Sequence, residues 1–141
     1  MKKIVYILLA VVLFSCDKLP VNGKLDGMWQ LMEIRHANNE KTYPERTYYR
    51  FQLELFRLNK VHEGSLHESK TDSYVGRFEF TEDSLSFYNI RKYKNENVAA
   101  TDKDLAPFGL NTSTDRFRIE ELTSSNMVLK SQDVQLVFRK F

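Results

Sequence analysis

Apolar and polar side chains alternate along much of the chain after residue 24, with the period of two that is typical of strands with one buried face. The alternation is clearest where Tyr49, Phe51, Leu53 and Leu55 are separated by polar or charged residues. Shorter runs of the same kind occupy residues 28–34, 74–80, 85–87, 117–119, 127–129 and 136–138. Polar turns at residues 81–84, 123–126 and 131–133 separate several of these runs. The pattern predicts an all-β antiparallel meander.

An open sheet of this length would leave unpaired edges. Closure into a barrel removes those edges, and a two-sheet sandwich is the alternative. We favour a small barrel of about seven to eight strands. Residues 36–46 and 94–115 break the alternation and are predicted to be long loops, which usually cover a site or take part in binding. Within the second loop, Thr101 and Asp104 have the spacing that caps a single helical turn.

The alternation also selects the side chains that point toward the centre of the predicted barrel. They are Tyr49, Phe51, Leu53, Tyr74, Phe78, Phe80 and Phe87. In a small barrel these residues would fill the interior, whereas in a larger one they would line an apolar ligand cavity, and both interpretations stay open. The same parity makes Arg57, Asn89 and Arg91 candidate polar anchors near the mouth of such a cavity.

The N-terminus has the pattern of an export signal. Two lysines precede eleven apolar residues, 4–14, whose only polar group is one tyrosine hydroxyl. As a helix this run would be about 16 Å long, at ~1.5 Å per residue, and a bilayer core needs about 30 Å. The segment is therefore too short to span a membrane, and residues 1–15 are predicted to be a secretory signal peptide.

The residues after the apolar run resemble the lipoprotein box of bacterial lipoproteins. Leu13, Ser15 and Cys16 match that box, and Phe14 departs from it because a smaller residue is usual there. The resemblance implies that diacylglycerol is attached to the sulfur of Cys16, which becomes the acylated N-terminus. Acyl chains contribute ~0.8 kcal/mol per buried CH₂, so two or more hold a protein firmly on a membrane. Residues 16–24 would then be a tether. An ordinary signal cleavage that leaves Cys16 as a free thiol is the alternative.

Removal of the signal changes the charge of the chain. Residues 1–15 contain two of the 21 basic residues and none of the 19 acidic ones, so the mature chain has 21 − 2 = 19 basic and 19 acidic residues. A neutral domain gives no support to nucleic-acid binding, which depends on a basic surface. With 42% hydrophobic residues the chain is too apolar to be disordered, and its one cysteine excludes a disulfide framework.

Catalytic and metal-binding patterns are not evident in the sequence. His62 and His67 are five residues apart, whereas two zinc ligands on one helical face are four apart. No nucleophile elbow, phosphate loop or dinucleotide fingerprint occurs, and the carboxylates fall on predicted outer faces or turns. We therefore expect no metal, no cofactor and no enzymatic activity.

A short motif opens the first predicted strand. Gly27-Met28-Trp29 resembles the Gly-x-Trp start of lipocalins and of the smaller lipocalin-like lipoproteins of Bacteroidota. The resemblance covers residues 25–141 and implies a barrel in which Trp29 plugs one end while a late arginine packs across its ring. Arg139 is the better placed candidate for that arginine, and Arg57 is the poorer one. Period-two counting puts Ile34 on the face opposite Trp29.

Two functional hypotheses follow. The first is an exported protein anchored by lipid in the cell envelope, with the outer membrane favoured, that binds a small apolar ligand inside the barrel. The alternative is a filled barrel whose loops 36–46 and 94–115 dock another envelope protein; an enzyme ranks third. In addition, Asp83-Ser84-Leu85 resembles the acceptor pattern for O-linked glycans in Bacteroidota envelope proteins, in a predicted turn that would suit access.

Overall fold

The structure is a computed structural model that describes residues 21–63, 70–113 and 116–141. The elements in chain order are η1 (Gly23–Leu25), β1 (Gly27–His36), β2 (Lys41–Thr42), β3 (Thr47–Gln52), β4 (Leu55–Val61), β5 (Thr71–Phe80), β6 (Ser84–Lys92), β7 (Asn95–Ala99), α2 (Asp102–Leu105), η2 (Ala106–Phe108), β8 (Arg116–Leu122), β9 (Asn126–Lys130) and β10 (Val134–Lys140), where η marks a 3₁₀ helix.

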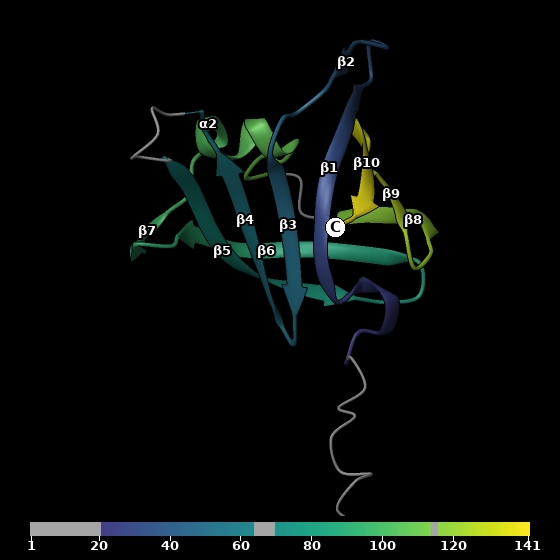
Figure 1. The fold of residues 1–141 in the computed structure, drawn as a ribbon, viewed down its shortest axis with the longest axis horizontal. Coiled ribbons are helices and arrows are strands. Elements are labelled where there is room, and N and C mark those ends of the chain that lie inside the picture. The colour runs from purple at the N-terminus through teal and green to yellow at the C-terminus, as the bar shows by residue number, and fades with distance from the viewer. Residues whose placement is uncertain (1–20, 64–69, 114–115) are drawn as a thin grey trace, which may run out of the picture.

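The strands close on themselves (Figure 1). Over the described residues, the antiparallel order β1-β3-β4-β5-β6-β8-β9-β10 returns to its start because β10 pairs with β1, which gives a closed eight-stranded barrel. The predicted all-β barrel is therefore confirmed. Closure leaves no open edge among these eight strands, while the short strands β2 and β7 are added to β1 and β6.

Alternation sets which side chains enter the barrel, and irregularities shift its phase. In β3 the residues alternate strictly, so Tyr49 and Phe51 are buried while Arg50 is exposed. In β1 a bulge between Leu31 and Glu33 adds one residue on that strand. Ile34 consequently joins the core with 2% exposure. The expectation that Ile34 lies opposite Trp29 is wrong because period-two counting fails at a bulge.

The second predicted loop folds back over the barrel. The helical turn predicted in it is present as α2, where the Thr101 hydroxyl accepts from the Asp104 amide and the Asp104 carboxylate accepts from the Thr101 amide. After α2 and η2 the chain reverses at Gly109, whose φ of +74° favours glycine and where a Cβ would collide with the Leu136 side chain. Residues 95–99, predicted to be irregular, form β7 instead.

The barrel thus has two differently built ends. We call the end that contains η1 and Trp29 the tryptophan end, and the end covered by α2 and η2 the helix end. Figure 1 shows the β3–β4 hairpin at the same end as η1, and α2 at the opposite end beside the start of β3. The core lies between the two ends and includes side chains from every strand of the closed ring.

Candidate functional site

The interior of the barrel is filled by aromatic rings. Tyr49 is fully buried at its centre, and its ring lies 4.8 Å from that of Phe138 and 6.0 Å from that of Phe87, measured between centroids. Phe51 lies 5.2 Å from Phe78 in an edge-to-face arrangement. Rings at these distances are in contact, so the space that an apolar ligand would need is occupied by side chains of the protein itself.

The helix end closes the interior with a buried hydrogen bond. The Tyr49 hydroxyl donates to the main-chain carbonyl of Phe108 at 2.5 Å, and the Phe108 ring packs edge-on to Tyr74 at 5.8 Å. Leu105 and Leu110, on either side of Phe108, are also buried. Burial raises the pKa of the Tyr49 phenol well above its ordinary value. Sequence parity misses these residues because they lie in a loop, although three apolar residues within six positions are a usable signal.

Three of the predicted lining residues lie outside the barrel. Leu53 is 59% exposed in the β3–β4 turn, where the strand alternation has already ended. Arg57 follows Phe56 and precedes Leu58, both buried, so it points outward and stacks on the Tyr93 ring at 3.8 Å. The predicted inward orientation of these two residues is wrong.

The third is Arg91, which is exposed and donates to the main-chain carbonyl of Glu96 on β7. A register shift in β5–β6 between Val75 and Arg77, together with positive φ at Asn89, changes the phase of β6 there. Asn89 is likewise exposed. Phe80 is partly buried against the core, and Tyr74 and Phe78 are buried.

Trp29 is fully buried at the tryptophan end, and its indole N–H donates to the Leu25 carbonyl at 2.8 Å. The cation on its ring is Lys140, whose Nζ lies 4.4 Å from the ring centroid. Arg139 points outward and donates to Gln30, so its predicted role is wrong. Register explains the difference, because Lys140 is opposite Trp29 and Arg139 is opposite Gln30. The sequence does contain a signal for Lys140, because residues 138 and 140 lie on the same face of a strand and Phe138 is buried.

Gly27 makes room for this arrangement. Its φ is +112°, and an added Cβ would lie 3.1 Å from both Cε and Nζ of Lys140. The Lys140 ammonium also donates to the main-chain carbonyls of Lys24 and Asp26. Burial lowers the pKa of Lys140, and the charge of Asp26 partly opposes that shift. The Gly-x-Trp motif therefore builds a lysine-capped plug.

The two long loops meet at the helix end around one hollow of about 390 Å³. Tyr43, Pro44 and Arg46 come from the first loop, and Ala106 and Pro107 come from the second. The end of β4, with Lys60 and Val61, and the two residues after it, His62 and Glu63, complete the wall. Tyr43 is 66% exposed and offers a ring to the outside. The structure thus brings together two loops that the sequence singled out separately.

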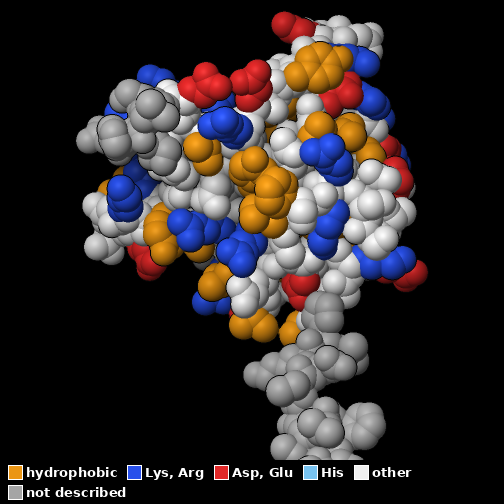
Figure 2. Space-filling model, in the orientation of Figure 1, with side chains coloured by type: hydrophobic (Ala, Val, Ile, Leu, Met, Phe, Trp, Pro, Cys, Tyr) orange, Lys and Arg blue, Asp and Glu red, His pale blue; other side chains and the backbone are white. Residues whose placement is uncertain are grey.

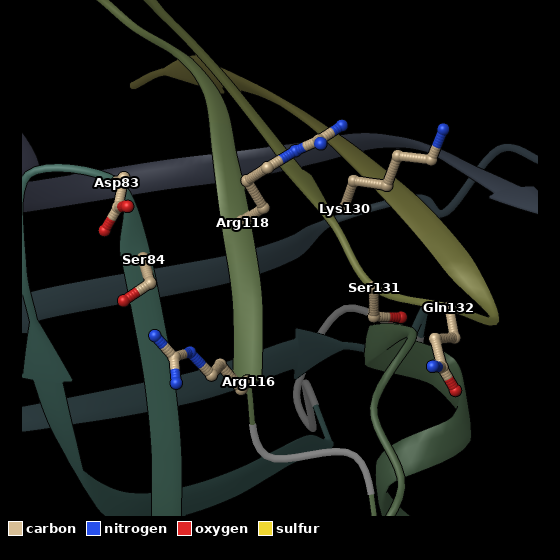
Figure 3. Close-up of a pocket in the computed structure, with 7 residues that line it drawn as sticks. All are labelled: Asp83, Ser84, Arg116, Arg118, Lys130, Ser131 and Gln132. Atoms are coloured by element: carbon tan, nitrogen blue, oxygen red, sulfur yellow. The ribbon is translucent and has the colours of Figure 1, made fainter.

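A second hollow, of about 480 Å³, lies on the outer wall (Figure 3). Arg116 and Arg118 project from β8, Lys130 from β9, and Asp83 and Ser84 from the start of β6. Ser84 is only 8% exposed, and its hydroxyl is 2.7 Å from that of Thr81. The expectation of an accessible glycan acceptor in a turn is wrong for the folded chain, because Ser84 begins strand β6.

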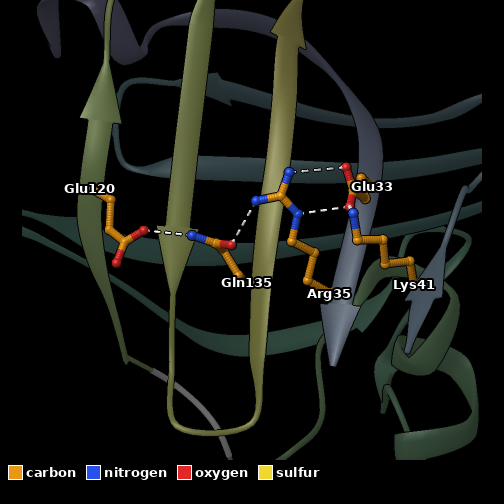
Figure 4. A network of polar contacts seen from close by, with 5 residues as sticks. All are labelled: Glu33, Arg35, Lys41, Glu120 and Gln135. Carbon is orange, nitrogen blue, oxygen red and sulfur yellow. Dashed lines mark hydrogen bonds and ion pairs between the residues drawn. The ribbon is translucent and has the colours of Figure 1, made fainter. Parts of the chain in front are cut away.

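The neighbouring outer face carries a polar network rather than a cleft (Figure 4). Arg35 donates to Glu33 at 2.7 Å and to Gln135 at 3.1 Å, and Gln135 donates to Glu120 at 2.6 Å. Lys41 on β2 lies 3.3 Å from Glu33. The hydrogen bond from Arg35 holds the pKa of the Glu33 carboxyl below its usual value. The network links β8, β10, β1 and β2 across the closure of the barrel.

Of the two histidines considered as metal ligands, the structure describes only His62. His62 Nε2 lies 2.6 Å from an Asp72 carboxylate oxygen, while His67 lies outside the described residues. Among residues 21–63, 70–113 and 116–141 no group of three or more potential ligands could hold a metal ion. Cys16 also lies outside the described residues. None of the helices formed by the described residues is both long and apolar enough to cross a bilayer.

The fold has close counterparts among solved structures. A lipocalin-like protein from Bacteroides uniformis ATCC 8492 has a TM-score of 0.65 and 24% identity, covering 84% of this chain and 100% of that one. An uncharacterized protein from Bacteroides eggerthii DSM 20697 has a TM-score of 0.63 and 22% identity, covering 83% and 99%. Japanin from Rhipicephalus appendiculatus, solved with bound cholesterol, has a TM-score of 0.50 and 9% identity, covering 89% and 80%.

A comparison with curated proteins finds no match. The family model described as lipocalin-like domain, however, matches residues 10–141, and the resemblance drawn from Gly27 and Trp29 is thereby confirmed. The match includes all eight strands of the closed barrel as well as the two segments, η1 and α2–η2, that close its ends. The chain belongs to the lipocalin-like domain family.

Proposed function

We propose that this chain is an exported, lipid-anchored protein of the cell envelope that acts without catalysis, as an interaction module built on a packed barrel. The observation that supports this proposal best is the filled interior. The Tyr49 hydroxyl is bonded to the Phe108 carbonyl, and this bond ties η2 across the helix end of the barrel. The anchor itself rests on the sequence box that ends at Cys16.

The hollow at the helix end is the best supported docking surface. It combines the exposed ring of Tyr43 with Pro44 and Pro107, and charged side chains such as Arg46 and Glu63 surround them. An apolar centre with a polar rim is the usual composition of a protein interface. A volume of about 390 Å³ suits one or two apolar side chains from a loop of a partner protein.

Ligand binding is the second candidate, because Japanin carries cholesterol in its crystal structure. In this chain Phe108, Tyr49 and Phe138 occupy the interior. A sterol-sized ligand would therefore have to displace α2 and η2 and break the Tyr49–Phe108 hydrogen bond. The packed state favours the interaction module.

Native mass spectrometry of the protein extracted from membranes separates the two candidates. We expect the mass of the acylated chain alone. An apolar molecule that co-purifies in a one-to-one ratio would contradict the interaction module and favour ligand binding.

Docking is tested by photo-crosslinking in intact cells. A photoreactive amino acid at Tyr43 should give a discrete protein adduct, whereas the same group at Tyr93 should not. Tyr93 is 45% exposed and lies away from the hollow, so it is a control of similar accessibility. Equal labelling from both positions would contradict docking at the helix end.

The anchor is tested by Cys16→Ala, which removes the sulfur that would carry the diacylglycerol. Membrane retention should be lost, because the acyl chains supply the binding free energy. The measurement is fractionation of cells in high salt, with the unaltered chain as the control. A variant that still sediments with membranes under those conditions would show that acylation is not the means of attachment.

A further inference from the structure

The tryptophan end exposes three apolar side chains that the core does not use. Val21 is 73% exposed, Leu53 59% and Leu55 47%. They lie together because the Asn22 side-chain amide donates to the Leu53 carbonyl at 2.8 Å, which holds the start of the described chain against the β3–β4 turn. We call these three residues the apolar tip. Figure 2 shows orange side chains at this end of the molecule with Lys and Arg side chains beside them.

The β3–β4 turn presents a leucine to solvent. Leu53 has a φ of +56°, which is typical of two-residue hairpin turns and which glycine or asparagine adopts at lower cost. Its side chain is 59% exposed, so the core does not use it. An apolar side chain at the tip of a hairpin is available for contact with a surface outside the domain.

Basic and aromatic residues adjoin the apolar tip on the outer wall. In the strand registers Leu55 is opposite Arg77, and Arg77 is opposite Tyr88, which is 40% exposed. Lys24 and Arg50 are exposed nearby on η1 and β3. Leu, Tyr, Lys and Arg together are typical of surfaces that lie in the headgroup region of a bilayer.

Charge does not distinguish the two ends. At the apolar tip, Glu54 is paired with Arg77 at 3.2 Å. At the helix end, exposed acids such as Glu45 are accompanied by exposed bases such as Arg46 and Lys103. The preference for the tryptophan end therefore rests on its exposed apolar side chains.

The position of Cys16 supports the same orientation. Val21 is only five residues after Cys16. At ~3.6 Å per residue, an extended chain between them reaches about 18 Å at most. An acylated Cys16 therefore keeps the tryptophan end, rather than the helix end, beside the membrane.

We propose that the apolar tip docks on the lipid surface that holds the anchor, with Leu53 and Leu55 among the headgroups and the hollow at the helix end facing away. This inference rests on the lipid anchor of the proposed function and adds a fixed orientation to it. The barrel then stands on the membrane as an oriented body, not as a particle on a loose tether.

The test uses the acylated, mature protein in vesicles of phosphatidylethanolamine and phosphatidylglycerol. Acylation blocks the thiol of Cys16, the chain's one cysteine, so an introduced cysteine is the single free thiol. The variants are Leu53→Cys and, as matched control, Tyr43→Cys, since their native side chains are similarly exposed at 59% and 66%. Each receives an environment-sensitive fluorophore, and the lipid carries a nitroxide quencher.

We expect the fluorophore at position 53 to shift to the blue and to be quenched, while the one at position 43 behaves as in water. Flotation of the same samples reports the anchor independently. If the protein floats but both fluorophores behave as in water, the docking is overturned and the anchor is not. Protein that does not float overturns the anchor and the docking with it.

A second variant separates docking from mere proximity. Leu55→Asp in the Leu53→Cys chain should reduce quenching to the level at position 43 and leave flotation unchanged. Leu55 is exposed, so circular dichroism should match that of the parent chain. Quenching that survives the aspartate would overturn the inference, because it would come from the tether alone.

Discussion

The two ends of the barrel are closed by opposite strategies. At the tryptophan end the hydrogen bond of the plug is local in sequence, because the Trp29 indole donates to Leu25, four residues earlier, and only the capping Lys140 comes from the far end of the chain. At the helix end the closing bond joins Tyr49 to Phe108, 59 residues later. A local plug is specified by a short motif and can be recognised in the sequence. A plug from a distant loop depends on how the whole chain folds, so no short motif in the sequence identifies it.

The largest effect is expected from Trp29→Ala at the tryptophan end. The change removes a fully buried ring, its hydrogen bond to Leu25 and the partner of the Lys140 ammonium. We expect a loss of about 4–5 kcal/mol in the free energy of unfolding, at the upper end of the range for large aromatic truncations. Urea denaturation measures it, and an unchanged midpoint would mean that Trp29 does not seal this end.

Phe108→Ala breaks the other seal with a different consequence. The expected loss is about 3–4 kcal/mol, because a buried ring leaves a cavity behind. The cavity lies against Tyr49 and Tyr74, so it should bind a small apolar probe such as benzene, as dry engineered cavities do. Isothermal titration of the variant and of the unaltered chain checks this. Equal binding of benzene by both proteins would show that the interior is already accessible.

Lys140→Met and Arg139→Met form a matched pair that tests which cation caps Trp29. We expect about 0.5–2 kcal/mol of destabilisation for Lys140→Met, the range of a partly desolvated cation–π contact. Arg139→Met should have almost no effect, because Arg139 is exposed and its hydrogen bond to Gln30 lies at the surface. Thermal unfolding of the two variants is sufficient. If Arg139→Met were the more destabilised variant, Arg139 would be the cation that caps Trp29, as the family resemblance implied.

The smallest expected effect is on the pH dependence of stability, through the capped turn α2 at the helix end. The carboxyl pKa of Asp104 is lowered chiefly by the Thr101 amide, and that of Asp102 by Thr112. The unfolded chain therefore binds more protons, so stability is full above their ordinary pKa of about 4 and falls as pH drops through the folded values. Asp104→Asn should make this acid loss shallower in urea titrations between about pH 5 and 3. The same pH dependence of the free energy of unfolding in both proteins would show that the Asp104 carboxylate does not contribute to stability in this range.

The parts of this fold that were predictable depend on near neighbours in sequence. Strand alternation was sufficient to place Tyr49, Phe51, Phe78 and Phe87 inside, and Thr101 to Asp104 was recognisable as a capped turn. Those features arise from side-chain parity and from hydrogen bonds within a few residues, which the sequence displays directly.

The predictions that failed depend on where alternation stops or changes phase. Ile34 follows a bulge, Leu53 lies in a turn and Arg91 follows a register shift. A single inserted residue reverses every later assignment on its strand, and propensity does not show where the insertion occurs. The choice between Arg139 and Lys140 required the pairing register of β1 with β10.

The pairing of β1 with β10 also has a consequence for the order of assembly. Arg139 and Gln30 are 109 positions apart in the sequence, so β1 has no partner on that side until β10 has been synthesised. Closing so long a loop costs chain entropy, and pairings between residues far apart in sequence slow folding. Until β10 pairs, β1 keeps one row of backbone hydrogen-bonding groups without partners, and such an edge can pair with another chain.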